Sequence, residues 1–376
     1  MGNCISERIS VRLDFLRGLA AQAVLIEHIL TTSGMNGVFI GSFGVVVFFI
    51  LSGFLIHITT ISAYEKGQFS IPYFISKRFF RIFTLYIPLI ILCFGIDIII
   101  QYFGLPQPEK VIQNYTVQNL IGSFFMLQQN VFSEFASQIF DMEFLNIKPY
   151  GSARPFWTVA IEWWIYLAYG FLFSFFIAKK KIPKVFSVYG MLFGFSLIVV
   201  VFNSISGIGH NLTFVWLIGA VVGHYYYRFD FTKLTVNNKY LLVLMVGLFL
   251  MFLGRIAHMK LSPMYVNAIP YDMVNVIIFT LFFICFLLLS SACIDRGWLS
   301  KFSRYIGEIS YSLYLIHFTI LSALYGMGMF DKFDAITFLV SFVVSNFLAV
   351  VLYYSIDRFH SLLWMRYWEL RVARAQ

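Results

Sequence analysis

The sequence has little charge: Lys, Arg, Asp and Glu make up 12% of its 376 residues, whereas hydrophobic residues make up 60%. Soluble domains carry about 25% charged residues, so this composition excludes an ordinary soluble fold. Polar stretches long enough to form a separate soluble domain are also lacking. The composition therefore predicts an all-α polytopic membrane protein with a single membrane domain over residues 1–376.

Cysteine is scarce as well, with only Cys4, Cys93, Cys285 and Cys293. Their spacing matches no metal-binding motif, and three of them lie in apolar segments. A disulfide framework and a thiolate metal site are therefore not expected. Acidic residues number 18 against 27 basic ones, a net charge of +9. In so apolar a chain we attribute this excess to membrane orientation and anionic lipid headgroups, and we expect no nucleic-acid partner.

Long apolar runs, in contrast, recur along the whole chain. At about 20 residues per crossing they predict about ten transmembrane helices. The predicted segments are 11–32, 38–58, 82–103, 155–178, 185–204, 209–227, 239–256, 273–293, 308–328 and 334–356. A weaker apolar stretch from Asn119, within the 104–154 loop, is interpreted as a re-entrant or interfacial piece.

The basic residues are distributed unevenly between alternate loops. With a cytoplasmic N-terminus, 21 of the 27 Lys and Arg residues fall on one face. This bias is what the positive-inside rule predicts for ten spans with both termini in the cytoplasm. The tail over 359–376, with two tryptophans among arginines, is predicted to be a cytoplasmic interfacial helix.

One predicted helix carries ionisable residues on a single face. In RGLAAQAVLIEH, Arg17 and His28 are eleven residues apart, which at about 100° per residue places both side chains on one stripe, with Asp14 within about 40° of it. His28 would then lie roughly 16 Å deeper than Arg17. Ionisable groups at such depth usually face a bundle interior or a watery cavity. In the alternative interpretation, His28 forms a hydrogen bond to a neighbouring helix and so stabilises helix packing, and Arg17 only orients the protein in the membrane.

Two further helices place ionisable residues at comparable depth. Glu162 lies about 10 Å inward from Pro155, and His317 lies about 14 Å inward from Glu308. A separate basic cluster, Lys77, Arg78 and Arg81, follows a loop at the predicted cytoplasmic face. Orientation alone explains any one of its members, whereas the cluster together with Arg17 is suited to a phosphorylated ligand.

These segments, taken together, resemble the membrane acyltransferase 3 family. The resemblance covers roughly residues 10–358 and rests on five patterns found in family order. The patterns are RGLAAQAVLIEH with Arg17 and His28, GSFGVVVFFILSGFLI from Gly41, KRFFRIFTLY with Lys77, Arg78, Arg81 and Tyr86, FWTVAIEWWIYL with Trp157, Glu162 and Tyr166, and GEISYSLYLIH with Tyr311 and His317.

The chain departs from the family pattern at three places. Val46 stands where an acidic residue is usual, Thr84 replaces a proline, and the last helix ends SIDRFH instead of the commoner Glu-Lys/Arg-Pro. The resemblance therefore leaves open which carboxylate takes the role of the missing acid, with Glu27 and Glu162 as candidates.

The resemblance implies an O-acyltransferase that moves an acetyl group from cytoplasmic acetyl-CoA to an envelope or exported carbohydrate, in a bacterial inner membrane. It places catalysis on His28, Arg17 and Glu162, and the donor phosphates on Lys77, Arg78, Arg81 and Arg17. The acceptor is expected at Trp157, Tyr311, His317 and Asp14, although Asp14 also suits a role in holding Arg17. No metal is implied.

Several alternatives remain open at this point. His28 is either a general base or a transiently acylated relay. The acceptor is lipopolysaccharide O-antigen, exopolysaccharide, a glycolipid or a small hydrophobic molecule, and acyl groups other than acetyl also fit. The competing function is a transporter or flippase that uses the same residues as a proton relay. The sequence does not fix the oligomeric state.

Overall fold

The computed structural model describes residues 6–35, 40–142, 145–181, 183–184, 186–207, 209–229, 237–260, 272–290, 297–332 and 334–373. Helices account for most of these residues, and no β-strand occurs among them. The fold is therefore all-α, as the sequence predicts.

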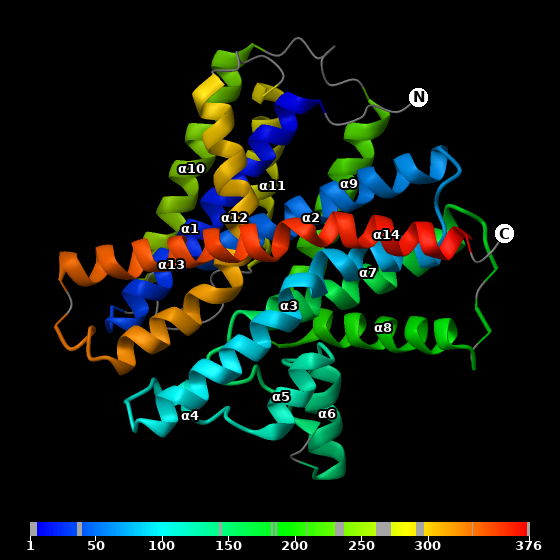
Figure 1. Cartoon of the computed structure of the whole chain (residues 1–376). Helices are drawn as coiled ribbons and strands as arrows, with labels where there is room; N and C mark the ends of the chain where they lie inside the picture. The colour runs from blue at the N-terminus through cyan, green and yellow to red at the C-terminus, as the bar shows by residue number, and fades with distance from the viewer. Residues whose placement is uncertain are drawn as a thin grey trace. The chain divides into compact units, whose positions relative to one another are not determined.

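Ten long helices occupy the ten predicted segments (Figure 1). They are α1 (Glu7–Thr32), α2 (Ile40–Glu65), α3 (Ile71–Tyr102), α7 (Phe156–Phe176), α8 (Val188–Ile205), α9 (Leu212–Arg228), α10 (Asn238–Lys260), α11 (Met273–Ser290), α12 (Gly297–Gly326) and α13 (Ala335–Ser355). Seven of the described helices are long and apolar enough to cross a membrane, namely α2, α3, α7, α8, α10, α12 and α13. The number of crossings and the side of each terminus stay predictions.

Two helices begin well before their predicted segments. Helix α3 starts at Ile71 because the hydroxyl of Ser70 accepts a hydrogen bond from the backbone N–H of Tyr73 at 3.3 Å and Pro72 suits the first turn. Helix α12 starts at Gly297, and its first turns are polar. Arg304, in these turns, pairs with Glu7 of α1. Hydropathy misses both starts because polar residues interrupt the apolar run.

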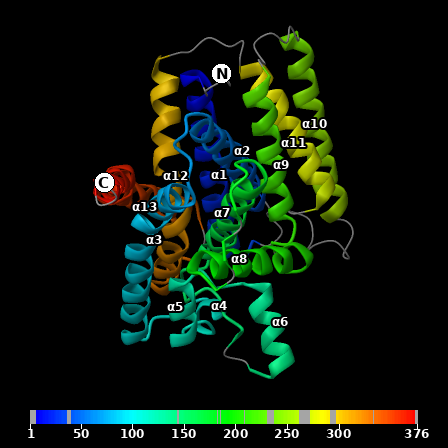
Figure 2. The same ribbon diagram turned by 90° about the vertical axis from the view of Figure 1, so that its right-hand side faces the viewer.

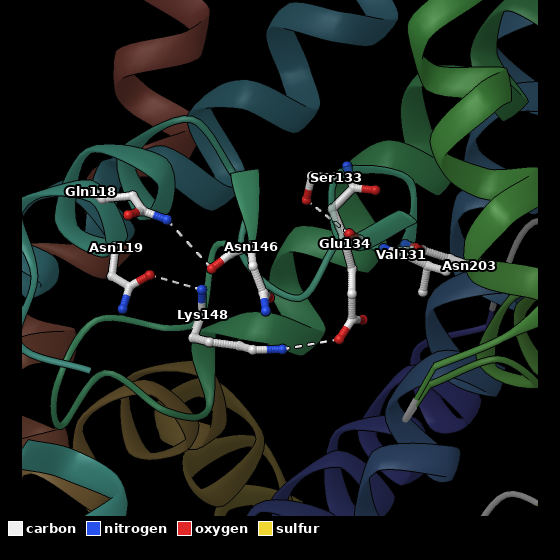
Figure 3. Close-up of polar contacts among 9 residues, drawn as sticks. Gln118, Asn119, Val131, Ser133, Glu134, Asn146, Lys148 and Asn203 are labelled. Atoms are coloured by element: carbon white, nitrogen blue, oxygen red, sulfur yellow. Dashed lines mark hydrogen bonds and ion pairs between the residues drawn. The ribbon is translucent and has the colours of Figure 1, made fainter. Parts of the chain in front are cut away.

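Three short helices lie in the segment 104–154, namely α4 (Glu109–Ile112), α5 (Val117–Phe124) and α6 (Val131–Phe140). Side chains hold this segment together (Figure 3). The side-chain Oδ1 of Asn119 accepts a hydrogen bond from the backbone N–H of Lys148 at 2.9 Å, and Oδ1 of Asn203 in α8 accepts one from the backbone N–H of Val131 at 3.0 Å. The stretch that begins at Asn119 is thus a short helix within an ordered loop.

The chain divides into two compact units, residues 1–65 with 211–311 and residues 66–210 with 312–376. The first unit contains α1, α2, α9, α10, α11 and the first half of α12. The second contains α3 to α8, the rest of α12, α13 and α14 (His360–Ala373). The sequence predicts one domain over residues 1–376. The division into two compact units does not test that prediction.

Helix α2 is the centre of the first unit, and glycines set how closely its neighbours approach. A β-carbon added at Gly53 would lie 2.0 Å from the carbonyl oxygen of Trp216 in α9, and one added at Gly219 would lie 2.2 Å from that of Ile50. On its other side, one added at Gly44 would lie 2.5 Å from the carbonyl of Ala20 in α1. Small residues at contacts of this kind are typical of helix packing in membranes.

The remaining helices of the first unit, α10 and α11, run side by side (Figure 2). Their apolar faces enclose Phe43 of α2, whose ring centroid lies 4.1 Å from that of Phe252 and 5.1 Å from that of Phe279. Aromatic contacts thus extend the core from α2 to both helices.

In the second unit, buried polar contacts connect the helices to the 104–154 segment. Trp164 of α7 donates to the carbonyl of Met126 at 2.7 Å, and Gln128 donates to the hydroxyl of Tyr86 in α3 at 2.9 Å. Helix α14, within the predicted tail, packs on α3, where Trp364 donates to the hydroxyl of Ser76 at 3.2 Å. The tail is helical as predicted, while its location at the membrane interface stays a prediction.

Candidate acyl-transfer site

The ionisable stripe of α1 begins with an ion pair. Arg17 donates to the carboxylate of Asp14 at 3.0 Å, one turn away, and both side chains are half-buried. Helix α12 closes over Asp14, because a β-carbon added at Gly307 would lie 2.6 Å from that of Asp14. Asp14 therefore limits the orientations that the Arg17 guanidinium adopts.

His28 lies half-buried on the same helix, next to an acidic residue with a different task. The carboxylate of Glu27 accepts hydrogen bonds from the backbone N–H groups of Gly41 at 2.7 Å and Ser42 at 3.4 Å, in the first turn of α2. An anion there stabilises the helix N-terminus. Val46, which replaces the family's acidic residue, is fully buried.

The basic cluster of α3 is held by its neighbours. Arg81 donates to the buried carboxylate of Asp357 at 2.8 Å. The ammonium of Lys77 lies 5.2 Å from the ring centroid of Trp364, and the guanidinium of Arg78 lies 5.7 Å from that of Phe74. Asp357 thus neutralises Arg81, and aromatic rings support the positive charges of Lys77 and Arg78.

Helices α7 and α12 bring a second set of predicted residues together. The hydroxyl of Tyr166 donates to the carboxylate of Glu162, one turn earlier. The hydroxyls of Thr158 and Tyr314 share a hydrogen bond of 2.7 Å, and the ring of His317 lies 6.1 Å from that of Tyr314. His317 is fully buried, with its Nδ1 3.1 Å from the carbonyl oxygen of Leu313.

The predicted residues fall into both units. Arg17, His28, Asp14 and the half-buried Tyr311 belong to the first, and the others belong to the second, including the half-buried Trp157. The expected proximity of His28 to Glu162 and His317, and of Arg17 to the basic cluster, stays a prediction.

Sequence reasoning missed three residues that the structure places in these groups. Asp357 was noted only as part of an unusual SIDRFH ending, although it neutralises Arg81. Tyr314 and Thr158 connect α12 to α7. The available signal is an acidic residue directly after the last predicted apolar segment, 334–356, because a charge that becomes buried there requires a partner.

A metal site receives no support from the described residues, which contain no group of three or more His, Cys, Asp or Glu side chains that could hold an ion. Two histidines do meet in the first unit, where Nε2 of His57 lies 3.1 Å from Nδ1 of His224.

Comparison with known protein families identifies the family of this chain. A family model described as an acyltransferase domain matches residues 10–355, which is nearly the whole chain. The chain belongs to this acyltransferase family. The match includes α1 with its ion pair, the basic cluster of α3 and the Glu162 segment of α7.

The acyltransferase also has a curated relative. It is 31% identical over 176 residues to the peptidoglycan O-acetyltransferase OatA of Listeria monocytogenes serovar 1/2a (strain ATCC BAA-679 / EGD-e). The aligned part makes up 46% of this chain and 25% of the relative, so the chain spans about a quarter of that protein. No solved structure matches the chain. The family and the apolar helices together identify an integral membrane acyltransferase.

Proposed function

We propose that this acyltransferase moves an acetyl group from acetyl-CoA to a hydroxyl of a cell-envelope or exported carbohydrate. The family assignment supports acyl transfer, and the similarity to the Listeria peptidoglycan O-acetyltransferase supports O-acetylation of an envelope polymer. The distribution of Lys and Arg supports a donor that arrives from the cytoplasm, with both termini on that side of a bacterial inner membrane.

The donor is an anionic nucleotide, and the basic cluster fits it unequally. Lys77 and Arg78 are adjacent near the start of α3, and each lies over an aromatic ring, Trp364 and Phe74 respectively. Arg81 is neutralised by Asp357. In this proposal Lys77 and Arg78 hold the donor phosphates, and Arg81 positions the turn of α3 that carries them.

His28 acts as the general base in the transfer step. In its neutral form the imidazole accepts the proton of the acceptor hydroxyl. The hydroxyl oxygen then forms a bond to the thioester carbonyl carbon, the carbon–sulfur bond breaks, and the coenzyme leaves as a thiolate that takes up a proton. General-base catalysis of this kind contributes typically about 10² to 10⁴-fold.

Glu162 and His317 serve the acceptor. The hydroxyl of Tyr166 fixes one oxygen of Glu162, and the contact between Thr158 and Tyr314 fixes the helix that carries His317. Side chains held in this way keep a sugar hydroxyl in one orientation, which lowers the entropic cost of transfer.

The observation that carries the proposal is the ion pair between Arg17 and Asp14. An arginine that served only as an orientation anchor would extend toward headgroups. Here the carboxylate of Asp14 accepts a hydrogen bond from the guanidinium of Arg17 at 3.0 Å, on the helix face that also carries His28. A fixed cation and a titratable base on one helix face suit a reaction that develops negative charge on a carbonyl oxygen.

The test measures thiol release from acetyl-CoA by the purified chain in nanodiscs, with and without carbohydrate acceptors. The proposal expects release in the wild type and a loss of at least about 100-fold in His28→Ala, since the base is removed. Arg17→Ala is expected to be similarly inactive.

A matched control is His210→Ala, because His210 is half-buried and, among the described residues, its hydrogen-bond contact is a local one, from Nδ1 to the carbonyl oxygen of Gly207 at 3.0 Å. This variant is expected to retain wild-type turnover. If folded wild-type protein neither binds acetyl-CoA nor releases thiol, the acyl-CoA-dependent reaction is wrong, and the transporter interpretation takes its place.

A further inference from the structure

The segment that leads into α7 is fixed on both sides by buried polar contacts. The backbone N–H of Ser152 donates to the carboxylate of Asp97 in α3 at 2.9 Å, and its hydroxyl donates to Thr319 of α12 at 3.1 Å. All three side chains are fully buried. Gly151, at φ +43°, leaves the space that this approach requires, since a β-carbon there would lie 2.3 Å from the Asp97 carboxylate. The backbone at Arg154 is therefore rigid.

Arg154 extends from this rigid segment onto α12. Its guanidinium carbon lies 5.2 Å from the ring centroid of Phe318, so the charged group stacks on an aromatic face. The side chain is half-buried, and within the described part of the chain it makes no ion pair and no side-chain hydrogen bond. Its N–H donors are thus available to a ligand.

Lys148, a cation of the same segment, has a carboxylate partner, unlike Arg154. Lys148 donates to the carboxylate of Glu134 at 3.2 Å, and its backbone is held by Asn119 (Figure 3). Arg17, Arg81 and Arg255 also each have a carboxylate partner. Arg154, in contrast, has no carboxylate partner among the described residues.

The electrostatic environment of Arg154 agrees with this geometry. Burial lowers the pKa of its guanidinium, with no neighbouring charge contributing. Arginine nevertheless stays protonated in proteins, so the site keeps a desolvated positive charge. An oxyanion placed against the guanidinium would compensate that cost through two parallel charge-assisted hydrogen bonds.

Arg154 also lies next to the residues assigned to the acceptor. The carbonyl of Pro155 accepts from the hydroxyl of Thr158 at 3.0 Å, and Thr158 contacts Tyr314. Phe318, under the guanidinium, directly follows His317 in α12. Glu162 comes eight residues after Arg154, about 12 Å along the helix axis, a distance that one or two sugar rings cover.

From these contacts we infer that Arg154 binds an oxyanion of the acceptor, a carboxylate or phosphate on the carbohydrate chain, and so makes the acyltransferase selective for acidic glycans. This inference rests on the proposed function, since it names the class of carbohydrate that the enzyme modifies. Arg154 is a specificity residue here and takes no part in bond breaking.

The test compares four acceptors with one sugar framework: methyl glucuronoside, its methyl ester, methyl glucoside 6-phosphate and methyl glucoside. Binding to the full-length protein in nanodiscs is measured by tryptophan fluorescence, and acetyl transfer is measured by mass. Wild type is expected to prefer an acidic form over the neutral ones by about 10-fold to 100-fold, as a charge-assisted hydrogen bond allows. The carboxylate and phosphate arms tell the two oxyanions apart.

The variant Arg154→Met keeps the apolar stem and removes the charge. The preference for acidic acceptors is expected to fall to less than about 3-fold, through KM rather than kcat, and Arg154→Lys is expected to restore part of it. The matched control Lys148→Met should keep the full preference, because Lys148 is already paired with Glu134.

Three results would overturn the inference: no preference for acidic sugars in wild type, a preference that survives in Arg154→Met, or an equal loss of kcat on acidic and neutral acceptors, which would indicate oxyanion stabilisation or misfolding. The failure of the proposed function is distinguishable. Selective binding of acidic sugars without any thiol release from acetyl-CoA would uphold the Arg154 site and reject the transfer reaction. Thiol release and acetyl transfer without selectivity would do the reverse.

Discussion

Arg81 of α3 and Asp357, in the 3-10 turn that follows α13, form an ion pair of 2.8 Å, and the carboxylate is 1% exposed. Removing one partner of a buried pair leaves an uncompensated charge. The substitution Asp357→Ala is therefore expected to lower the free energy of unfolding by about 3 kcal/mol, measured by denaturant or SDS titration in mixed micelles.

The matched control for this prediction is Glu134→Ala, which breaks the half-exposed pair with Lys148. Exposed pairs contribute about 0 to 1 kcal/mol, so this variant should unfold close to wild type. If the two variants lose the same unfolding free energy, the burial of Asp357 does not determine how much its ion pair contributes to stability.

A second prediction concerns the orientation of Arg17. Asp14→Asn keeps the size of the side chain and removes the charge that holds the guanidinium. Because misplaced catalytic groups cost up to about 100-fold, thiol release from acetyl-CoA should fall at least about 10-fold while the protein stays folded. Glu7 lies in the same helix as Asp14, and Glu7→Gln removes the exposed carboxylate that pairs with Arg304 of α12; this variant should leave turnover unchanged. Wild-type turnover in Asp14→Asn would contradict a role for the pair.

A third prediction follows from the close approach of α2 and α9. Gly219→Ala would place a methyl group 2.2 Å from the carbonyl oxygen of Ile50, so the two helices must separate. Overpacking of this kind costs about 1 to 3 kcal/mol in unfolding free energy. In contrast, nothing lies within 4 Å of a β-carbon at Gly247 in α10, and Gly247→Ala should stabilise the protein by up to about 1 kcal/mol. A Gly219→Ala variant as stable as wild type would be incompatible with this packing.

A fourth prediction is a pH dependence at the start of α13. The N–H of Thr337 donates to the carboxylate of Asp334 at 2.7 Å, and this hydrogen bond lowers the pKa of Asp334 below its ordinary value of 3.8. A carboxyl with a depressed pKa in the folded state stabilises that state above the unfolded pKa and loses the contribution as pH falls through the folded one. Wild type should therefore lose thermal stability below about pH 4 more steeply than Asp334→Asn, whose amide caps the helix without titrating. Parallel melting curves from pH 3 to 7 would rule this out.

The positions of the long helices were predictable from the sequence, because a helix that crosses a membrane needs about 20 consecutive apolar residues and such runs are visible in the sequence. The starts of α3 and α12 were not, since Ser70 and Arg304 stabilise turns whose hydropathy is low. Helix spacing placed Arg17 beside Asp14, and the structure shows this contact.

Long-range pairs lay beyond sequence reasoning. The use of Glu27 at the N-terminus of α2 depends on where the loop after α1 returns the chain, which no local pattern records. The contact between Thr158 and Tyr314 joins residues 156 positions apart. For the same reason, whether His28 lies near Glu162 depends on the tertiary structure, and the sequence motifs do not give the answer.

The pair of Arg81 and Asp357 has a consequence for how the protein is made. The two residues are 276 positions apart in the chain. At translation rates of about 5 to 20 residues per second, Arg81 emerges about 14 to 55 s before its partner. A nascent chain that stops anywhere in that interval carries Arg81 without Asp357. Arg81 of α3 therefore meets this carboxylate only after α13 has been synthesised, so the contact forms late in the production of the chain.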